Sequence, residues 1–547
     1  MPFRGYTASP KETLGIGPTT PINIGNLADQ LAEHPDQQFV QFLIQGLTYG
    51  FDTGFVETPQ SPLICKNLQS ALQDPLAVTE LILKETDKGF LQGPFNNIPF
   101  ASFRINPVGL ATHKYSLKKR LIVDMSAPHD NPDHPSLNSL IDKESHSLQY
   151  VRIDDAIKII KAKGRGSKLI KTDISDAFKL LPIRPDLWQY HGIQWNKQFY
   201  FFTRLVFGSR SSPKIFDNLS RAICWIAKYK HSIQDVLHLL DDFLVIVNPS
   251  DNADFIREQF LGIFHLLQVP IAPHKTEGPS TQLEYLGVTL DTDRMEIRLP
   301  SQKVDRILET IASFSSRKTC TKRELLSLLG HMNFASKAIR HGRSFVAQLI
   351  ALSTTVKKLH HHVTLSAAIR SDLQMWATLL RHWNGASFFL DDNITLAADM
   401  HIYTDATPTS FGGIFLNKWF QGTFPPEFMH EQQSMALCEL YPIVMACVMW
   451  GSQWSNKRIL FHCDNLATVH IISKGRSKVK SINKLMRRLT YHSALFNFII
   501  HAQHIPGKEN TIADALSRFQ MVTFKALAPH ADLLPTPCIP MEQLMMT

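Results

Sequence analysis

The sequence predicts a multidomain protein of the α+β class. Its 547 residues exceed the length of a typical domain several times, so two or more hydrophobic cores are expected. The composition is 44% hydrophobic and 19% charged, which excludes a mainly disordered or fibrous chain. Short β-branched runs alternate with helical stretches over residues 94–299 and again over 398–519, and the residues between them are almost wholly helical in pattern.

These changes of pattern predict five segments. Residues 1–92 combine a leader rich in Pro, Gly and Thr with a helical extension, in which apolar residues recur at helical spacing. A first α/β part spans 93–300, a helical part spans 301–392, and a second α/β part spans 393–519. We expect the proline-containing residues 520–547 to form a flexible tail.

Charge and cysteine usage indicate the class of partner and the compartment. The net charge is +9, with 57 Lys and Arg against 48 Asp and Glu, which favours a polyanionic partner because clustered cations release counterions from phosphates. The seven cysteines are scattered without a C-x-x-C pair, as expected in a reduced, intracellular compartment. No secretory signal layout opens the chain and no apolar run approaches the ~20 residues of a membrane helix, so we expect no membrane association.

Three carboxylates in the first α/β part are predicted to meet at strand ends. Residues 168–178 read as a strand that ends at Asp173, and residues 236–247 read as a hairpin with Asp241 and Asp242 at its tip. Taken alone, the Asp-Asp pair is better explained as a polar turn, and the acid after a strand as a helix cap. Together they would repel one another unless cations lie among them, and a pair of divalent ions about 3.5–4 Å apart is the arrangement used in phosphoryl transfer.

The segment between these acids predicts a turn that leads into a helix. Gly208 permits a tight turn, Ser212 can cap, and Pro213 suits the first helical position. Such a turn can place backbone amides against a nucleotide or a template base, although an ordinary loop into a packed helix has the same pattern.

The order of these motifs resembles the reverse transcriptase palm. The resemblance rests on Asp173-x-x-Asp176-Ala177-Phe178, on Phe207-Gly208 with Ser-Ser-Pro, and on Leu240-Asp241-Asp242. It implies that Asp173, Asp241 and Asp242 bind Mg²⁺ together with the backbone carbonyl of Ile174. It also implies that Asp176, Ala177, Phe178, Phe207 and Gly208 line the nucleotide site, and that the ring of Phe178 excludes a ribose 2′-OH and selects deoxynucleotides.

Two basic residues and two departures complete this comparison. Arg120, in Lys119-Arg120-Leu121-Ile122, is similar to the fingers Arg that contacts the triphosphate, and Lys275 stands where the family often has a Lys near the leaving pyrophosphate. Leu239 replaces the usual aromatic residue, and Val206 stands where Pro is frequent. An RNA-dependent RNA polymerase has a similar arrangement of palm acids, but Phe178 and the C-terminal part of the chain argue against this alternative.

Four acids on separate elements mark a second cluster in residues 393–519. Asp405 ends a β-run, Glu439 lies in a helical stretch, Asp464 ends another β-run, and Asp514 lies in a later helix. The order Asp, Glu, Asp, Asp resembles ribonuclease H, which implies that all four acids bind metal at a second two-metal site. His504 in His-Ile-Pro-Gly-x-x-Asn would then be the loop histidine of that family.

Residues 27–518 resemble most the reverse transcriptase and ribonuclease H of DIRS-type retrotransposons, with gypsy-type and pararetroviral enzymes close behind. The resemblance implies a right-hand polymerase with fingers, palm and thumb, followed by an α/β ribonuclease H-like domain. It also implies two Mg²⁺ per site, for which Mn²⁺ could substitute, and location in a cytoplasmic particle or the nucleus.

The same resemblance implies the partners: RNA template, DNA primer, RNA/DNA hybrid and deoxynucleoside triphosphates. Integration would need a recombinase or integrase on another polypeptide, and the sequence does not indicate an oligomeric state. The contrasting hypothesis is a domesticated, catalytically silent nucleic-acid-binding scaffold. Domestication often relaxes metal ligands, whereas all seven acids are present here.

Overall fold

The computed structural model divides into two compact units, Met1–Leu283 and Glu284–Thr547. It describes residues 15–59, 61–112, 119–129, 131, 133–339, 342, 345–383, 387–388, 400–429, 434–455, 457–475, 477, 479–496 and 498–544. Both units combine helices with sheets, which confirms the predicted multidomain α+β class.

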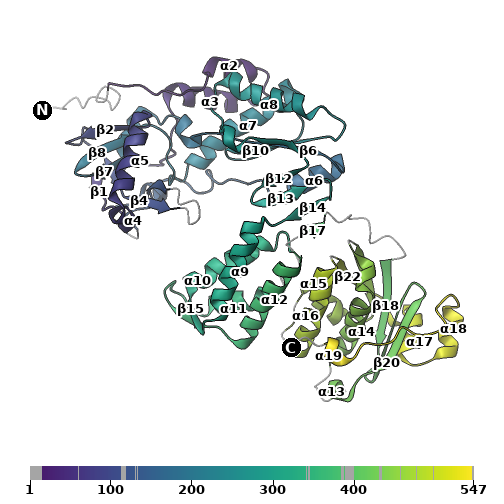
Figure 1. Ribbon diagram of the computed structural model, residues 1–547. Helices are drawn as coiled ribbons and strands as arrows, with labels where there is room; N and C mark the ends of the chain where they lie inside the picture. The colour runs from purple at the N-terminus through teal and green to yellow at the C-terminus, as the bar shows by residue number, and fades with distance from the viewer. Residues whose placement is uncertain are drawn as a thin grey trace. The chain divides into compact units, whose positions relative to one another are not determined.

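The strands of unit 1 form two larger sheets and a hairpin in the described part of the chain (Figure 1). The sheet with order β11-β6-β10-β9 consists of Glu277–Ser280, Lys168–Asp173, Asp242–Val247 and Val236–Leu239. The sheet with order β1-β3-β7-β8-β2 consists of Leu63–Ile64, Arg104–Asn106, Gly192–Trp195, Gln198–Phe202 and Leu91–Phe95. The hairpin pairs β4 (Val108–Thr112) with β5 (Lys119–Val123). Residues 243–247, Phe-Leu-Val-Ile-Val, are buried, which explains why β10 is apolar without alternation.

Helices pack against these sheets, and the buried side chains of most of them belong to one hydrophobic core. They are α2 (Ile24–Gln30), α3 (Gln37–Tyr49), α4 (Gln69–Gln73), α5 (Pro75–Asp87), α6 (Ile153–Lys163), α7 (Ser212–Lys230) and α8 (Ala253–Leu267). The Asp36 side chain caps α3 and the Asn252 side chain caps α8, each by accepting a backbone N–H. Pro213 lies in the first turn of α7, as its sequence predicts.

The N-terminal part of unit 2 is helical, with small sheets at its ends. Its helices are α9 (Ser301–Ser315), α10 (Lys322–Ala335), α11 (Ala347–Thr354) and α12 (Ala367–Trp383). Its strands are β12 (Gln282–Tyr285), β13 (Val288–Asp291), β14 (Glu296–Arg298), β15 (Thr319–Thr321), β16 (His362–Thr364) and β17 (Ser387–Phe388). The division between the units falls within β12, before Pro300, because β12, β13, β14 and β17 pair with one another. The five-segment division itself stays a prediction.

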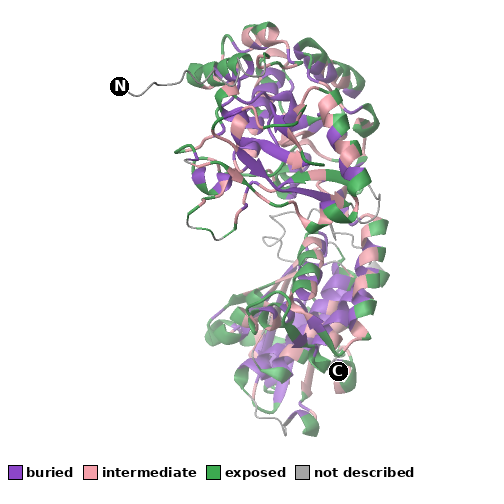
Figure 2. Ribbon diagram, turned by 90° about the vertical axis from the view of Figure 1, so that its left-hand side faces the viewer, coloured by how far each residue is buried: buried purple, intermediate pink, exposed green. Residues whose placement is uncertain are grey.

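A five-stranded sheet organises the rest of unit 2, with order β20-β19-β18-β21-β22. The strands are Lys418–Thr423, Ser410–Phe415, His401–Ala406, Arg458–Cys463 and Ile499–His504. The helices are α13 (Pro426–Met429), α14 (Met435–Trp450), α15 (Leu466–Lys474), α16 (Lys480–Leu495), α17 (Thr511–Ser517), α18 (Met521–Leu527) and α19 (Met541–Leu544). Side chains on the two faces of this sheet belong to separate cores: Ile402 packs with α14, and Ile414 packs with α17 and α18. Figure 2 shows the buried residues concentrated on the strands and the inner helices.

The expectation of a flexible tail is wrong for residues 520–544. The backbone N–H groups of Asp532 and Thr536 donate to the carbonyls of Asn417 and Trp419, along the outer strand of the sheet. Leu544 is fully buried in the core that includes α14. The prolines mark the irregular backbone of this segment, but its apolar side chains and its hydrogen bonds to the strand edge hold it in place.

The expectation that no apolar run approaches membrane-spanning length also needs correction. Within the described residues, Met435–Trp454 is long and apolar enough to cross a membrane by length and composition. However, 78% of its most apolar window is buried inside the unit, and Glu439 lies within it. A core helix of a folded unit passes the same test, so this segment is weak evidence for membrane association.

Two candidate carboxylate sites

Strand register brings the first three acids together in unit 1. Asp173 ends β6 and pairs with Asp242, the first residue of the antiparallel strand β10. Asp241 occupies the turn between β9 and β10, and its carbonyl accepts a hydrogen bond from the Ile174 N–H at 3.0 Å. The turn begins at Leu240, whose positive φ of 54° is left-handed and whose carbonyl accepts the Ser220 hydroxyl. The predicted strand end and hairpin tip therefore exist, and they adjoin each other.

The electrostatics of this cluster are those of crowded, half-buried carboxylates. Burial and the neighbouring Asp173 raise the pKa of Asp241, and burial is the main cause that raises the pKa of Asp242 to about 6. Lys275, the residue predicted to lie near the leaving pyrophosphate, contacts an acid of the cluster: its Nζ lies 2.7 Å from Asp173 Oδ1. Arg120, on β5, also acts electrostatically on Asp241 and lowers its pKa.

Two phenylalanine rings lie in tilted contact at the end of the Asp173–Phe178 segment. Phe178 is only 5% exposed and lies under Phe207, which is 55% exposed, with ring centroids 4.6 Å apart. Ala177 is buried at the start of the short helix η2 (Ala177–Leu180). Asp176 precedes it in a left-handed conformation with φ 52° and forms an ion pair with Lys88. The ring of Phe207, rather than that of Phe178, is therefore the more exposed surface.

Gly208 occupies a position that excludes other residues. Its φ is 112°, and an added Cβ would lie 2.1 Å from the carbonyl oxygen of Val123. Asn138 holds the loop, because its side-chain amide donates to the Gly208 carbonyl at 2.8 Å and its oxygen accepts the Arg210 N–H at 2.8 Å. Sequence reasoning missed Asn138, which stands in no motif.

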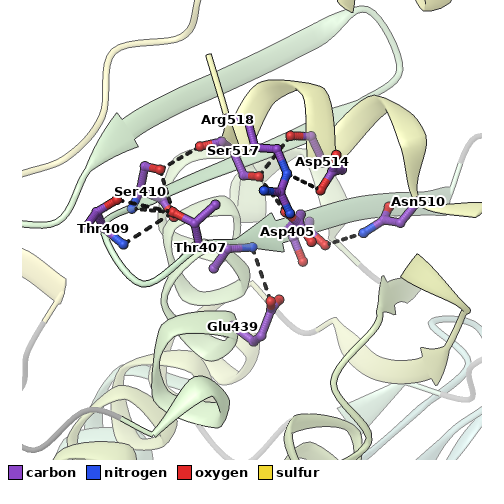
Figure 3. A network of polar contacts seen from close by, with 11 residues as sticks. Asp405, Thr407, Thr409, Ser410, Glu439, Asn510, Asp514, Ser517 and Arg518 are labelled. Atoms are coloured by element: carbon purple, nitrogen blue, oxygen red, sulfur yellow. Dashed lines mark hydrogen bonds and ion pairs between the residues drawn. The ribbon is translucent and has the colours of Figure 1, made fainter. Parts of the chain in front are cut away.

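The second cluster forms where parallel strands of unit 2 end. Asp405 is the next-to-last residue of β18, and Asp464 directly follows the parallel strand β21, whose register pairs His462 with Tyr403. Glu439 reaches the site from α14 and accepts the Ala406 N–H at 3.2 Å, and Asp514 reaches it from α17 (Figure 3). The structure thus brings together the four acids that the sequence places on separate elements.

Burial dominates the electrostatics of these acids. Glu439 is 2% exposed, and burial, followed by the charges of Asp405 and Asp464, raises its pKa to about 9. The pKa of Asp405 is likewise raised to about 6. Burial is the main cause, the charges of Asp464 and Asp514 also raise it, and the hydrogen bond from Ser517 lowers it. A neutral Glu439 at pH 7 relieves part of the repulsion, which a bound cation would relieve in its place.

A thiol that sequence reasoning missed completes the second cluster. Glu439, Cys463 and Asp464 each offer one ligand atom, all within 4.8 Å of one another. Cys463 Sγ donates to Glu439 Oε2 at 3.7 Å, and burial raises the pKa of this thiol well above its ordinary value. Among the described residues this is the one group of three ligand atoms within 4.8 Å of one another. The carboxylate oxygens of Asp173, Asp241 and Asp242 are therefore farther apart than these three atoms.

The residues around Asp514 support the cluster from α17. Arg518 Nε donates to Asp514 Oδ1 at 2.7 Å, and the Ser517 hydroxyl donates to Asp405 (Figure 3). Arg518 stands four residues after Asp514, the spacing at which opposite charges on a helix meet, and this is the signal that could have identified it. His504 ends β22 opposite Cys463 and is exposed, as a loop histidine at the edge of the site would be.

Both clusters fit divalent cations by the chemistry of their donors. Carboxylate oxygens are the ligands that Mg²⁺ prefers. Asp242 Oδ1 is buried and has no hydrogen-bond partner among the described residues, which is costly unless a cation binds it. Cys463 is a poor ligand for so hard an ion, and its thiol instead donates a hydrogen bond to Glu439.

Comparisons with known proteins agree with the palm motifs. Residues 96–290 match the family model described as "Reverse transcriptase (RNA-dependent DNA polymerase)". This segment is therefore a reverse transcriptase domain, and it contains Arg120, Lys275 and the three acids of the first cluster.

The similar curated proteins are retroelement polyproteins. The chain is 22% identical over 330 residues to "Retrovirus-related Pol polyprotein from transposon opus" of Drosophila melanogaster, covering 58% of this chain and 31% of that protein. It is 23% identical over 305 residues to the "Gag-Pro-Pol polyprotein" of Human T-cell leukemia virus 3 (strain 2026ND), covering 54% of this chain and 18% of that protein. The chain thus spans less than a third of the length of these relatives.

Two solved foamy viral structures are similar over most of this chain. One is a protease-reverse transcriptase in complex with RNA/DNA hybrid, with 15% identity, TM-score 0.46, and coverage of 92% of this chain and 64% of that chain. The other is the form named dRH in complex with ds DNA, with 14% identity, TM-score 0.47, and coverage of 90% and 85%.

Proposed function

We propose that this chain is the RNA-directed DNA polymerase of a retroelement and that unit 2 degrades the RNA strand of RNA/DNA hybrids. The observation that carries the proposal is the pairing of Asp173 with Asp242 beside the Asp241 turn, within a segment that matches the reverse transcriptase family. The cluster of Asp405, Glu439, Asp464 and Asp514 supports the ribonuclease H activity.

In unit 1, Asp173, Asp241 and Asp242 would hold two Mg²⁺ ions, with Mn²⁺ as a substitute and the Ile174 carbonyl as a further ligand. Bound Mg²⁺ supplies the positive charge that stabilises phosphoryl transfer. The primer 3′-OH attacks the α-phosphate of a deoxynucleoside triphosphate, and pyrophosphate leaves. Arg120 contacts the triphosphate, while Phe178 with Phe207 limits the space beside the sugar. Lys275 exchanges its contact with Asp173 for the leaving phosphates.

In unit 2, the four acids would hold the same kind of ions at the scissile phosphate of the RNA strand. A water molecule attacks the phosphodiester and leaves 5′-phosphate and 3′-OH ends. Ser517 and Arg518 orient Asp405 and Asp514 through the hydrogen bonds that they donate. The exposed His504 assists the release of the product or the movement of a proton.

The proposal extends to the element and its setting. The segment Phe207–Pro213 and the helix that contains Leu27, Ala28 and Asp29 support a DIRS-type element. The partners are then RNA template, DNA primer and RNA/DNA hybrid, in a cytoplasmic particle or the nucleus. A recombinase gene beside the coding region would support this lineage, and an integrase gene in the same reading frame would contradict it.

A paired assay on one RNA/DNA substrate tests both activities. With Mg²⁺, the wild-type chain should extend the DNA primer and shorten the labelled RNA strand. Asp241→Asn should abolish extension and keep RNA cleavage, and Asp464→Asn should do the reverse, because each change removes a charge from one cluster only. Removing a catalytic metal ligand of this kind lowers rates by orders of magnitude.

Binding without turnover would decide for the scaffold hypothesis. If the wild-type chain binds the hybrid but neither extends nor cleaves it with Mg²⁺ or Mn²⁺, the proposed activities are wrong. Retained hybrid binding by both variants is the control that they are folded.

A further inference from the structure

A cavity in unit 1 has no role in the proposed reactions. Its volume is about 420 Å³, within the range of small-ligand sites. Phe39 and Phe42 of α3, Lys214 of α7, Asp52 and His146 are among its lining residues. The cavity lies at the start of α7, a few residues after Phe207 and Gly208.

Aromatic rings continue from this cavity along the outer face of α7. Phe39 lies 5.0 Å from His34, His34 lies 4.9 Å from Trp225, and Trp225 lies 5.1 Å from Tyr229, measured between ring centroids. Phe42, whose ring also contacts Phe51, is 41% exposed, and Tyr229 is 61% exposed, so both ends of the row are accessible to solvent. The stretch of α7 from Lys214 to Tyr229 is about 22 Å long at 1.5 Å per residue.

Cations alternate with these rings. Lys214, Arg221 and Lys228 recur every seven residues on α7, which places them on one side of the helix. The Arg221 guanidinium lies 5.3 Å from the centroid of Phe39, and Lys228 Nζ lies 5.3 Å from that of Tyr229. Of the acids nearby, Glu33 pairs with Lys230 and Asp52 pairs with Arg184. The face therefore has the charge that complements a polyanion.

We infer that this face, which we call the α7 track (Phe39, Phe42, Lys214, Arg221, Trp225, Lys228 and Tyr229), binds unpaired single-stranded nucleic acid. Alternating rings and cations bind such strands, because every unpaired base offers a face for stacking and every linkage offers a phosphate. A duplex has no free base faces along its length, so the exposed rings would gain nothing from it. The inference rests on the proposed function, since a template awaiting copying is such a strand.

Fluorescence anisotropy with the full-length chain tests the α7 track. One RNA template/DNA primer duplex is blunt, and the other carries a short unpaired 5′ extension of the template. The wild-type chain should bind the extended substrate more tightly than the blunt one. The double change Phe42→Ala and Tyr229→Ala should weaken binding of the extended substrate about tenfold or more and leave blunt binding unchanged.

Matched variants separate the track from a general loss of binding. Phe255→Ala removes a ring that is 58% exposed on α8 and should have no effect. Lys214→Gln and Lys228→Gln should each reduce the salt slope of binding to the extended substrate by about 0.7. Equal losses on both substrates, or no loss beyond that of Phe255→Ala, would overturn the inference.

The outcome also separates this inference from the proposed function. If the chain fails to extend primers while the ring variants still lose binding of the extension, the polymerase proposal fails and the track stands. If extension proceeds and the variants bind as the wild type does, only the track is wrong. A dimer that dissociates on Phe42→Ala would assign the face to a second copy of the chain and contradict the inference.

Discussion

At the residue scale, the burial of two acids determines how strongly each cluster needs a bound cation. Asp242 has a buried oxygen that no described residue hydrogen-bonds, and Glu439 is almost fully buried in a helix that is otherwise apolar. The ionised form of either acid is costly in the absence of a cation, because burial removes the hydration of the charged carboxylate. Motif order alone identified both residues. Asn138, Cys463 and Ser517 act through contacts formed only on folding, so the sequence pattern did not identify them.

The sugar selectivity of the proposed polymerase activity should depend on Phe178. Phe178→Ala should raise ribonucleotide incorporation roughly ten- to hundredfold relative to deoxynucleotide incorporation, because space opens beside the sugar. Single-nucleotide extension with matched triphosphates measures this ratio. The ring is buried against Phe216, so truncation should also cost about 3–5 kcal/mol of stability, which a thermal melt would report. Phe216→Leu is the control, and selectivity that is unchanged in Phe178→Ala would remove Phe178 from this role.

At the scale of elements, the sequence predicted where strands end, but it did not predict which distant segments pack against one another. The strand that ends at Asp173, the hairpin at Asp241 and the run that ends at Asp464 have the expected places, because alternating or β-branched runs fix local conformation. The tail was predicted wrongly because its order comes from the edge of β20, more than a hundred residues earlier. The approach of α3 to α7 is equally non-local and left no signal in the sequence.

The packed tail should stabilise unit 2. Leu544→Ala should lower its free energy of unfolding by about 2–5 kcal/mol, because Leu544 is fully buried against the core that contains α14. Urea denaturation followed by the fluorescence of the buried Trp450 and Trp454 would measure this change. Leu534→Ala in the same tail removes a side chain that is 78% exposed and should change stability by less than about 0.5 kcal/mol. Equal effects of the two changes would contradict the packed tail.

The whole molecule combines a net positive charge with two pockets of negative charge. The net charge of +9 suits a nucleic-acid partner, whereas each acidic cluster suits cations that neutralise it. Each cluster lies entirely within one of the two compact units. We therefore expect the two sites to respond to metal independently.

Mg²⁺ should stabilise the folded chain, and more strongly at high pH. Burial raises the pKa of Glu439 to about 9, so without a cation its contribution to stability is complete below its ordinary pKa near 4.5 and is lost as pH rises towards 9. Because a bound cation requires the ionised form, the rise in melting temperature with Mg²⁺ should be larger at pH 8.5 than at pH 6. At saturation, each tenfold increase in Mg²⁺ adds about 1.4 kcal/mol per site. Asp241→Asn with Asp464→Asn should lose this gain, and an equal gain with NaCl of matched ionic strength would contradict it.

The buried helix α14 has a consequence for synthesis of the chain on the ribosome. The segment Met435–Trp454 emerges before α16 and β22, which later cover it. Because synthesis proceeds at about 5–20 residues per second, this apolar segment stays uncovered for seconds before α16 and β22 have been made. During that interval it is a natural substrate for chaperones, and for signal-recognition factors that select nascent apolar segments. Glu439, near its start, is the one charged side chain in this segment, and a charge of this kind is unfavourable in a transmembrane helix.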